Sequence, residues 1–408
     1  MILKNKEKIN KRWCILTVLM LLTTNLLVVR VLGYPVVLMF VLLPYWFYIT
    51  FEIVFVKRYN IWFLFFAICL IPFINYSDVY DWSEFFKTYS QLVMNAFFLL
   101  FFCYSQKTKI NRETVMKALN IAQNIILLLT VIQTFEFYYL STKYFWNIFG
   151  DLTSLNEIAR DYKGEGFRAK AMYHEPSHLG LIMVFIFFMK QIVDKKLTVN
   201  NFIKSTTVIV LAKSSLGYLV FPIATFIFLR YYFRGFRLII FYLTLTVVGS
   251  IIVINYSNQI LESTKINEAL DTEKVTSGYM RWGLPLAIIE DQIKKGQIYG
   301  HGLGQISTDY FWMISPMLEY ENVEEASISN GLLSAIIELG IFFILFLCYV
   351  FFYKFWKLNR NWRAFTLLNL IALTGSTYLM VQSYFICFYL PILVLKVMDN
   401  EVKYNYSL

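Results

Sequence analysis

The feature that most constrains this chain is a series of apolar runs separated by short basic segments. About 20 apolar residues are enough for a helix to cross the ~30 Å hydrocarbon core of a bilayer. Hydrophobic residues make up 58% of the 408 residues and charged residues only 16%, so a water-soluble fold would expose much apolar surface. The candidate spans are Trp13–Val29, Tyr34–Val56, Asn60–Asn75, Phe86–Tyr104, Val115–Leu140, His178–Val193, Phe202–Leu211, Leu216–Tyr231, Leu238–Tyr256, Ile328–Phe352, Ala364–Met380 and Gln382–Val397. We therefore predict an all-α bundle of about twelve transmembrane helices, forming a single integral membrane domain over residues 1–408.

The basic residues predict how this bundle is oriented. Lys and Arg gather at every second boundary between the runs, beginning with the segment before the first one. Positive charge concentrates on the cytoplasmic side of membrane proteins, which predicts that both chain ends are cytoplasmic. The net charge of +10 is then explained by membrane insertion and does not indicate a nucleic-acid partner. Two long polar segments, about 141–177 and 257–327, are predicted to be external loops.

The first external loop ends in a dense group of reactive and charged side chains. Arg168 and Lys170 precede His174 and Glu175, and Pro176 suits the first turn of a helix. Arg offers a rigid fork of donors that matches phosphate oxygens, while His and Glu are general acid–base residues. The other interpretation is structural: Glu175 caps the helix, His174 lies at the membrane interface, and Arg168 is an ordinary loop residue.

The second external loop combines an arginine, an amphipathic segment and a glycine-rich turn. Arg281 precedes Trp282–Gln292, in which Leu284, Ile288 and Ile289 fall on one face of a helix. Gly300-His-Gly-Leu-Gly304 then predicts an irregular, closely packed turn. No strand is expected before these glycines, so they do not indicate a dinucleotide site.

Two charged residues within apolar surroundings are further candidates. Lys213 lies between two adjacent predicted helices, where a break allows polar backbone to line a cavity, although a lysine reaching towards the interface explains it equally well. Glu338 lies inside an apolar run and is either functional or paired with a neighbour for packing. The five cysteines show no CxxC or Cys/His cluster, so we expect no metal site.

These clusters resemble one family of membrane enzymes. The segment from Arg168 to Gly180, with its Glu-Pro-Ser core, resembles a loop–helix junction of O-antigen and capsular polysaccharide polymerases. Ser277–Trp282, Tyr299–Gly304, Ser329-Asn330 and Glu338–Ile341 resemble, in the same order, the second external loop and following helix of the O-antigen polymerase–ligase superfamily. Ligases of that superfamily usually carry a His where this chain has Ser329, so the resemblance favours a repeat-unit polymerase.

The resemblance implies a glycosyltransferase that joins oligosaccharide repeat units for O-antigen, capsule or exopolysaccharide. Its donor would be an undecaprenyl-pyrophosphate-linked oligosaccharide, joined at the outer face of the bacterial cytoplasmic membrane. We expect no cofactor, neither metal nor nucleotide, and as further partners membrane lipid, a chain-length regulator and a flippase. Glu175 or His174 would be the catalytic base, and the donor's pyrophosphate and glycan would bind Arg168, Arg281, Lys213 and Lys170.

Two other functions stay open at this point. A glycan ligase of the same superfamily would use a different acceptor. A flippase for lipid-linked oligosaccharides also has twelve or more helices, but it would show two similar halves and short external loops. The long external loops and the few charges inside the apolar runs favour the polymerase.

Overall fold

A computed structural model describes most of the helical segments of the chain. The described residues are 2–23, 27–31, 34–51, 59–74, 81–104, 108–142, 144, 167–173, 176–195, 198–232, 282–305, 330–349, 359–374 and 385–406. Their contacts divide the chain into two compact units. Unit 1 comprises Met1–Val56, Phe101–Tyr232 and Phe385–Leu408, and unit 2 comprises Lys57–Leu100 and Phe233–Tyr384.

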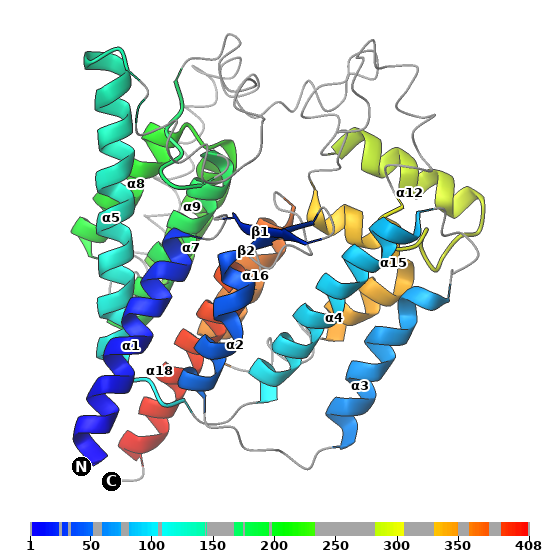
Figure 1. The fold of residues 1–408 in the computed structure, drawn as a ribbon, viewed down its shortest axis with the longest axis horizontal. Helices are drawn as coiled ribbons and strands as arrows, with labels where there is room; N and C mark the ends of the chain where they lie inside the picture. Colours follow the sequence, from blue (N-terminus) through cyan, green and yellow to red (C-terminus); the bar gives the residue numbers. More distant parts are fainter. Residues whose placement is uncertain are drawn as a thin grey trace. The chain divides into compact units, whose positions relative to one another are not determined.

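Unit 1 is a helical bundle with one small hairpin (Figure 1). Its elements are α1 (Ile2–Leu22), β1 (Leu27–Val31), β2 (Tyr34–Val37), α2 (Leu38–Thr50), α5 (Arg112–Tyr139), α7 (Pro176–Asp194), α8 (Val199–Ala212), α9 (Ser215–Tyr232), the π-helical turn η8 (Phe385–Tyr389) and α18 (Leu390–Tyr406). The strands pair antiparallel, with Arg30 opposite Pro35 and Val31 opposite Tyr34. The predicted helical architecture is confirmed, with this hairpin as an addition.

The core of unit 1 is built around α7. Its residues from Leu179 to Val193 are all buried, including Phe185, Phe187 and Phe188. A helix that is apolar on every side is stable only when neighbours or lipid surround it completely. Helices α5, α8, α9 and α18 all pack against α7. The helix is therefore the centre of this unit and not a lipid-facing element.

Helices α1 and α2 are joined by a reciprocal pair of tryptophan hydrogen bonds. Trp13 Nε1 donates to Thr50 Oγ1 at 2.9 Å, and Trp46 Nε1 donates to Thr17 Oγ1 at 2.8 Å. Buried indole N–H groups need such partners. The predicted boundaries of these two spans are wrong. The run over 13–29 leaves the helix at Leu22, and the run over 34–56 starts as a strand, because β-branched Val residues on both sides of the turn favour pairing.

Helices α1, α2, α5 and α7 run in alternating directions between two ends of unit 1. At one end, Lys109 N donates to Thr50 O, which joins the end of α2 to the start of α5. At the other end, Tyr173 Oη donates to Leu21 O, which joins the segment between α5 and α7 to the end of α1. Figure 1 shows the N- and C-termini together at the first end. This alternation is what the basic residues predict, while the assignment of that end to the cytoplasm stays a prediction.

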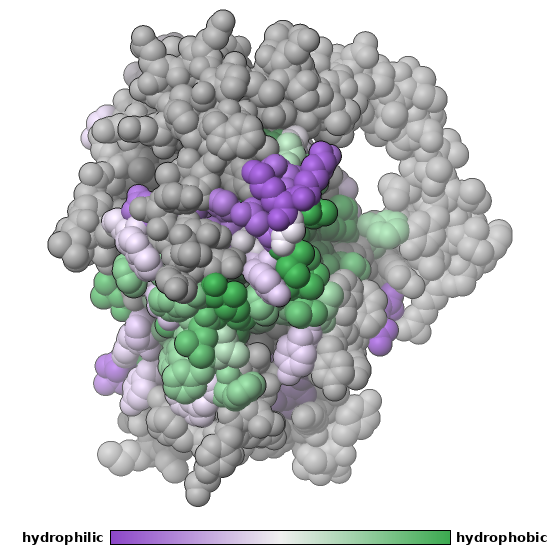
Figure 2. Space-filling view, turned by 90° about the vertical axis from the view of Figure 1, so that its right-hand side faces the viewer, coloured by the Kyte–Doolittle hydropathy of each residue, from purple (hydrophilic) through white to green (hydrophobic). Residues whose placement is uncertain are grey.

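Unit 2 contains α3 (Tyr59–Leu70), the 3₁₀ turn η1 (Ile71–Phe73), α12 (Leu284–Lys294), α15 (Gly331–Leu347) and α16 (Arg360–Leu373). It also contains α4 (Trp82–Tyr104) as far as Leu100, and the last residues of that helix belong to unit 1. An aromatic cluster joins η1 to α4, in which Phe73 contacts Phe85 and Tyr89. On the side that carries α3 and α12, hydrophilic side chains gather above a band of hydrophobic ones (Figure 2). Helix α3 exposes Trp62, Phe63 and Phe66, which suits a lipid-facing surface.

Two described helices are long and apolar enough to cross a membrane, Arg112–Tyr139 and Pro176–Asp194. Shorter apolar helices occur at Val41–Thr50, Val199–Ala212, Leu216–Phe226 and Gly331–Phe346. The number of about twelve spans stays a prediction. Several of the predicted runs, among them Leu238–Tyr256, lie partly or wholly outside the described residues.

Candidate functional site

In unit 1, the segment that carries the first predicted cluster is fastened to α5. We call residues 167–173 the arginine loop. Gln133, buried in α5, accepts hydrogen bonds from Lys170 N (3.2 Å) and Ala171 N (2.8 Å) and donates Nε2 to Ala171 O (2.8 Å). Phe167 stacks on Phe137 with ring centroids 4.3 Å apart. One side-chain amide thus replaces the backbone partners that this loop would otherwise lack.

Arg168 lies where the arginine loop meets the end of α8. Its Nη2 donates to the carbonyl oxygen of Lys213 at 2.9 Å, and Ala169 N donates to Leu211 O at 3.3 Å. Lys213 ends α8 in the left-handed conformation, with φ 45° and ψ 43°, and its side chain is exposed. The predicted break between two helices is confirmed, and it brings two predicted phosphate-binding cations to one place.

The third predicted cation, Lys170, differs from these two because its side chain is only 3% exposed. A buried ammonium group needs a partner, and the predicted role of Lys170 in binding the donor stays a prediction. Beside it, Tyr173 is fully buried and anchors the loop on α1 through Leu21. Glu136, buried one turn after Gln133, accepts hydrogen bonds from Thr142 Oγ1 and Tyr144 N, and so holds the chain just after α5.

The second group of predicted residues lies in unit 2. The amphipathic helix is confirmed as α12, with Leu284 and Ile288 buried and Leu286 and Ile293 exposed. Its charged face carries the ion pairs Glu290–Lys294 and Lys295–Asp291, both at 2.7 Å. Residues 297–305, which we call the glycine turn, follow directly, with φ of +87° at Gly300 and +95° at Gly302. The irregular turn predicted from the three glycines is confirmed.

The glycine turn inserts its backbone into a break in α15. At Gly340 the backbone leaves the helical conformation, with φ 53° and ψ −137°. In a regular helix, Ile341 N would donate to Ile337 O. Instead it donates to Ile298 O at 2.9 Å, while Ile337 O accepts from His301 N (2.8 Å) and from Gln292 Nε2 (2.9 Å). The turn thereby satisfies backbone groups that the break exposes.

This contact is so close that it requires glycine on both sides. A Cβ atom on Gly300 would lie 2.5 Å from Glu338 O, and one on Gly340 would lie 2.3 Å from Ile298 O. A Cβ atom on Gly304 would lie 2.9 Å from Glu84 O of α4. No side chain fits at such distances, so the glycines are required for close backbone approach as well as for positive φ.

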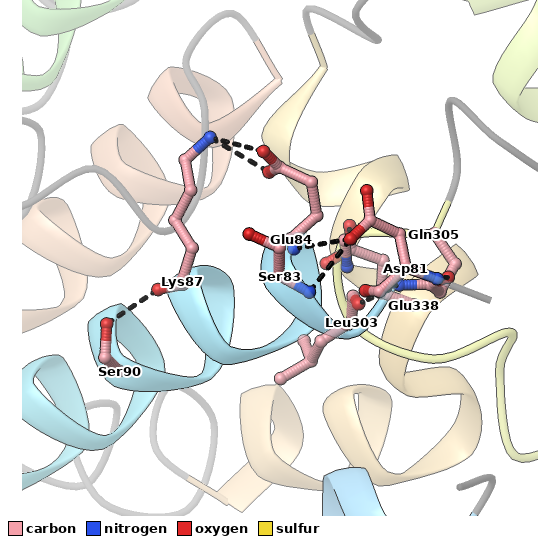
Figure 3. A network of polar contacts seen from close by, with 9 residues as sticks. Asp81, Ser83, Glu84, Lys87, Ser90, Leu303, Gln305 and Glu338 are labelled. Atoms are coloured by element: carbon pink, nitrogen blue, oxygen red, sulfur yellow. Dashed lines mark hydrogen bonds and ion pairs between the residues drawn. The ribbon is translucent and has the colours of Figure 1, made fainter. Parts of the chain in front are cut away.

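Glu338 and Asp81, the residue that precedes α4, complete the fastening of the turn (Figure 3). Glu338 is 8% exposed, and its Oε1 accepts from Gly304 N at 3.2 Å. Buried Gln305 and Asp81 exchange two hydrogen bonds, from Asp81 N to Gln305 Oε1 and from Gln305 Nε2 to Asp81 O, both at 3.0 Å. Asp81 Oδ1 also caps α4 by accepting from Glu84 N. The intramembrane carboxylate predicted at 338 therefore supports the turn.

The predicted site residues that the structure describes fall into two groups, one within each unit. The structure joins Arg168 to Lys213 in unit 1, and the glycine turn to Glu338 in unit 2. His174, Glu175, Arg281 and Ser329 lie outside the described residues, so their roles stay predictions. Asn330, which follows Ser329, is buried and caps α15 by accepting from Leu333 N at 3.1 Å. Among the described residues, no group of three or more His, Cys, Asp or Glu side chains is placed to hold a metal ion.

Sequence reasoning missed the polar residues of α5 that build the site. Gln123, Thr130, Gln133 and Glu136 are all buried and recur every three to seven positions, which places them on one side of the helix. That spacing inside the predicted span Val115–Leu140 was a signal that this helix faces polar partners. It could not reveal that the main partner of Gln133 is loop backbone.

In a comparison against protein-family models, residues 13–397 match the model described as WcaD colanic acid polymerase. The chain belongs to the WcaD colanic acid polymerase family. Comparisons with curated proteins and with solved structures give no match.

The WcaD match extends over both structural units, so the arginine loop and the glycine turn both lie within the matched region. Membership makes the chain a membrane-associated polymerase of lipid-linked repeat units for exopolysaccharide or O-antigen, which is a glycosyltransferase-type activity. Ligation and transport, the two other functions compatible with the sequence, are not what this family is described as doing.

Proposed function

We propose that this chain elongates its polysaccharide at the outer face of the cytoplasmic membrane, using undecaprenyl-pyrophosphate-linked oligosaccharide as the donor. The observation that carries the proposal is the arginine loop, fastened at the end of unit 1 opposite the chain termini. There Arg168 is held against the left-handed end of α8 at Lys213. A fixed guanidinium beside a second cation is suited to a pyrophosphate group.

In the proposed reaction, a sugar hydroxyl of one lipid-linked repeat unit attacks the anomeric carbon of another. The new glycosidic C–O bond forms as the bond from the anomeric carbon to the pyrophosphate oxygen breaks. The hydroxyl proton passes to a base, for which Glu175 and His174 are the candidates, and undecaprenyl pyrophosphate leaves. Neither a nucleotide nor a metal ion takes part in this scheme.

The role of the cations follows from where charge develops. Negative charge grows on the leaving pyrophosphate in the transition state, and donors that are already oriented stabilise it without reorganisation. Arg168 is oriented by the Lys213 carbonyl, and Lys213, which is exposed, is proposed to bring its ammonium group to the same pyrophosphate. Arg281, which precedes α12, is the proposed second arginine. Lys170 is buried next to Arg168 in the loop, and it stays a proposed contact of the donor.

The test replaces Arg168 by Ala and by Lys in cells that lack their own polymerase. Loss of one oriented donor to a developing anion costs roughly 10²–10³ in rate, so we expect the Ala variant to make almost no polymer. The Lys variant should recover little, because a point charge lacks the planar fork. Arg12→Ala is the matched control, since Arg12 is exposed on α1 and its neighbour Trp13 bonds to Thr50 at the end of α2, away from the arginine loop. Polymer length on gels and protein level in membranes are measured together.

Normal polymer from Arg168→Ala would remove this residue from the site. The same assay with Glu175→Gln and with His174→Ala separates the two candidate bases. The outer-face assignment has its own test: reporter fusions after Asn156 and after Asn267 should both read external. A cytoplasmic signal at either position would reject the orientation. A chain-length regulator and a flippase are the expected partners in the same pathway.

A further inference from the structure

Unit 1 contains an open cavity of about 810 Å³ that the polymerisation chemistry does not use. It lies between the start of α5 and the end of α7, at the end where the chain termini lie. The arginine loop is at the opposite end of the same unit. The volume falls within the ~300–1,000 Å³ range of small-molecule sites. The residues of interest in its wall are Arg112, Glu113, Lys117, Asn120, Asn124 and Asp194.

The wall presents charges of both signs within one cavity. Lys117, Asn120 and Asn124 follow one another at helical spacing on α5, so they lie on one face. Asp194 reaches the same cavity from the last residue of α7. Two cationic and two anionic side chains, with amide groups between them, suit a ligand that itself carries one charge of each sign. A purely anionic ligand would meet two carboxylates at short range.

The helices behind the cavity carry a buried polar network. Lys190 of α7, 6% exposed, donates to Gln123 Oε1, and Gln123 Nε2 donates to Asn201 Oδ1 at 2.7 Å and to Ser205 Oγ at 3.0 Å. Next to Lys190, Gln191 is 1% exposed, and neither atom of its amide has a hydrogen-bond partner among the described residues. Polar groups buried inside apolar helices are costly and mark functional sites.

A third cation lies beside the wall on α8. Lys204 Nζ donates to Asn124 Oδ1 at 2.7 Å, and Asn124 is one of the lining residues of α5. In the wall itself the basic groups are supplied by α5, and the carboxylates by α5 and α7. The Asp194 carboxylate therefore reaches the cavity from a different helix than the two cations.

We propose that this cavity binds the headgroup of a zwitterionic phospholipid with a primary ammonium group, the phosphatidylethanolamine class. The phosphate ester lies against Lys117 and Arg112, where charge-assisted hydrogen bonds are strongest. The ammonium group donates to the Glu113 and Asp194 carboxylates. A choline headgroup has no N–H to donate, and a glycerol headgroup has no cation, so both bind more weakly.

The test uses the purified full-length protein in detergent, to which single lipids are added. Native mass spectrometry gives the affinity of phosphatidylethanolamine, phosphatidylcholine and phosphatidylglycerol, and soluble phosphoethanolamine is titrated separately. We expect phosphatidylethanolamine to bind at least fivefold more tightly than either other lipid. Lys117→Ala should weaken it at least fivefold, whereas Lys11→Ala, an exposed lysine of α1 that does not line the cavity, should leave it unchanged.

Asp194→Asn tests the ammonium side of the cavity separately. It should reduce phosphatidylethanolamine binding to the level of phosphatidylglycerol while leaving phosphatidylglycerol itself no weaker. Equal affinities for the three lipids in the unaltered protein would overturn the proposal, as would equal binding by Lys117→Ala and Lys11→Ala. Soluble phosphoethanolamine that binds as tightly as the lipid would also overturn it and would identify the cavity as a site for a soluble phosphate ester.

Discussion

The contact between the glycine turn and α15 predicts a large difference between two glycine-to-alanine changes that are four residues apart. Gly296 and Gly300 both have positive φ, +71° and +87°. A Cβ atom on Gly296 would meet nothing within 4 Å, whereas one on Gly300 would lie 2.5 Å from Glu338 O and 2.7 Å from Gly340 N. The two substitutions therefore share the backbone strain and differ in the overlap.

The magnitude follows from these two contributions. An alanine in the left-handed region costs roughly 1–2 kcal/mol, which both variants experience. Gly300→Ala adds an overlap with backbone atoms that cannot rotate away, and overpacking of this kind costs typically ~1–3 kcal/mol more. A difference of ~1–3 kcal/mol corresponds to about 5–150-fold in the population of the docked turn. We expect polymer synthesis to fall by a similar factor, because the turn holds the broken segment of α15 in place.

The assay compares Gly296→Ala and Gly300→Ala in cells lacking their own polymerase. Polymer amount is normalised to protein level in the membrane, and the thermal denaturation midpoint of each purified variant is measured in detergent. Gly296→Ala should lower the denaturation midpoint by the backbone strain alone and keep most polymer synthesis, whereas Gly300→Ala should fall further in both measurements. The reasoning would be refuted if Gly300→Ala made as much polymer per molecule as Gly296→Ala.

Two further predictions concern side chains that hold loops. Glu338→Gln keeps an oxygen acceptor for Gly304 N and should retain most polymer synthesis. Glu338→Ala leaves that N–H without its acceptor, at a cost of ~1–3 kcal/mol, and should lower the denaturation midpoint. Equal behaviour of the two variants would argue against the hydrogen bond. Gln133→Leu removes three hydrogen bonds to the arginine loop and should make that loop more sensitive to limited proteolysis. The control is Gln91→Leu, at a half-buried glutamine of α4. Unchanged protease sensitivity of Gln133→Leu would show that Gln133 does not hold the loop.

Periodicity predicted those parts of the fold that depend on local chemistry. The amphipathic helix predicted at 282–292 is confirmed within two residues at each end. Its apolar residues recur at helical spacing, and Pro285 favours the first turn of a helix. The left-handed break at Lys213 and the irregular glycine turn are also local features. The run over 34–56 was wrong for a local reason too, since hydropathy alone cannot distinguish a β-branched strand from a span.

Contacts between distant segments were not predictable in this way. Gln133 could be recognised as a buried polar residue, but its partners lie 37 and 38 positions away on a loop backbone. Backbone groups are the same in every residue, so no side-chain pattern marks which loop will supply them. The same limit applies to Gln292, whose amide binds the carbonyl of Ile337, 45 positions away.

The role of Glu338 shows how several ambiguous signals become specific when they are combined. Taken alone, a carboxylate inside an apolar run is as compatible with packing as with catalysis. Gly340 two residues later opens the helix, and the exposed carbonyls of Ile337 and Glu338 then accept from the backbone N–H groups of the closely packed glycine turn. The glycines at 300, 302 and 304 supply that shape, and Glu338 accepts the Gly304 N–H at the far end of the turn. Because this carboxylate holds the turn, we assign it a structural role and keep His174 and Glu175 as the proposed bases.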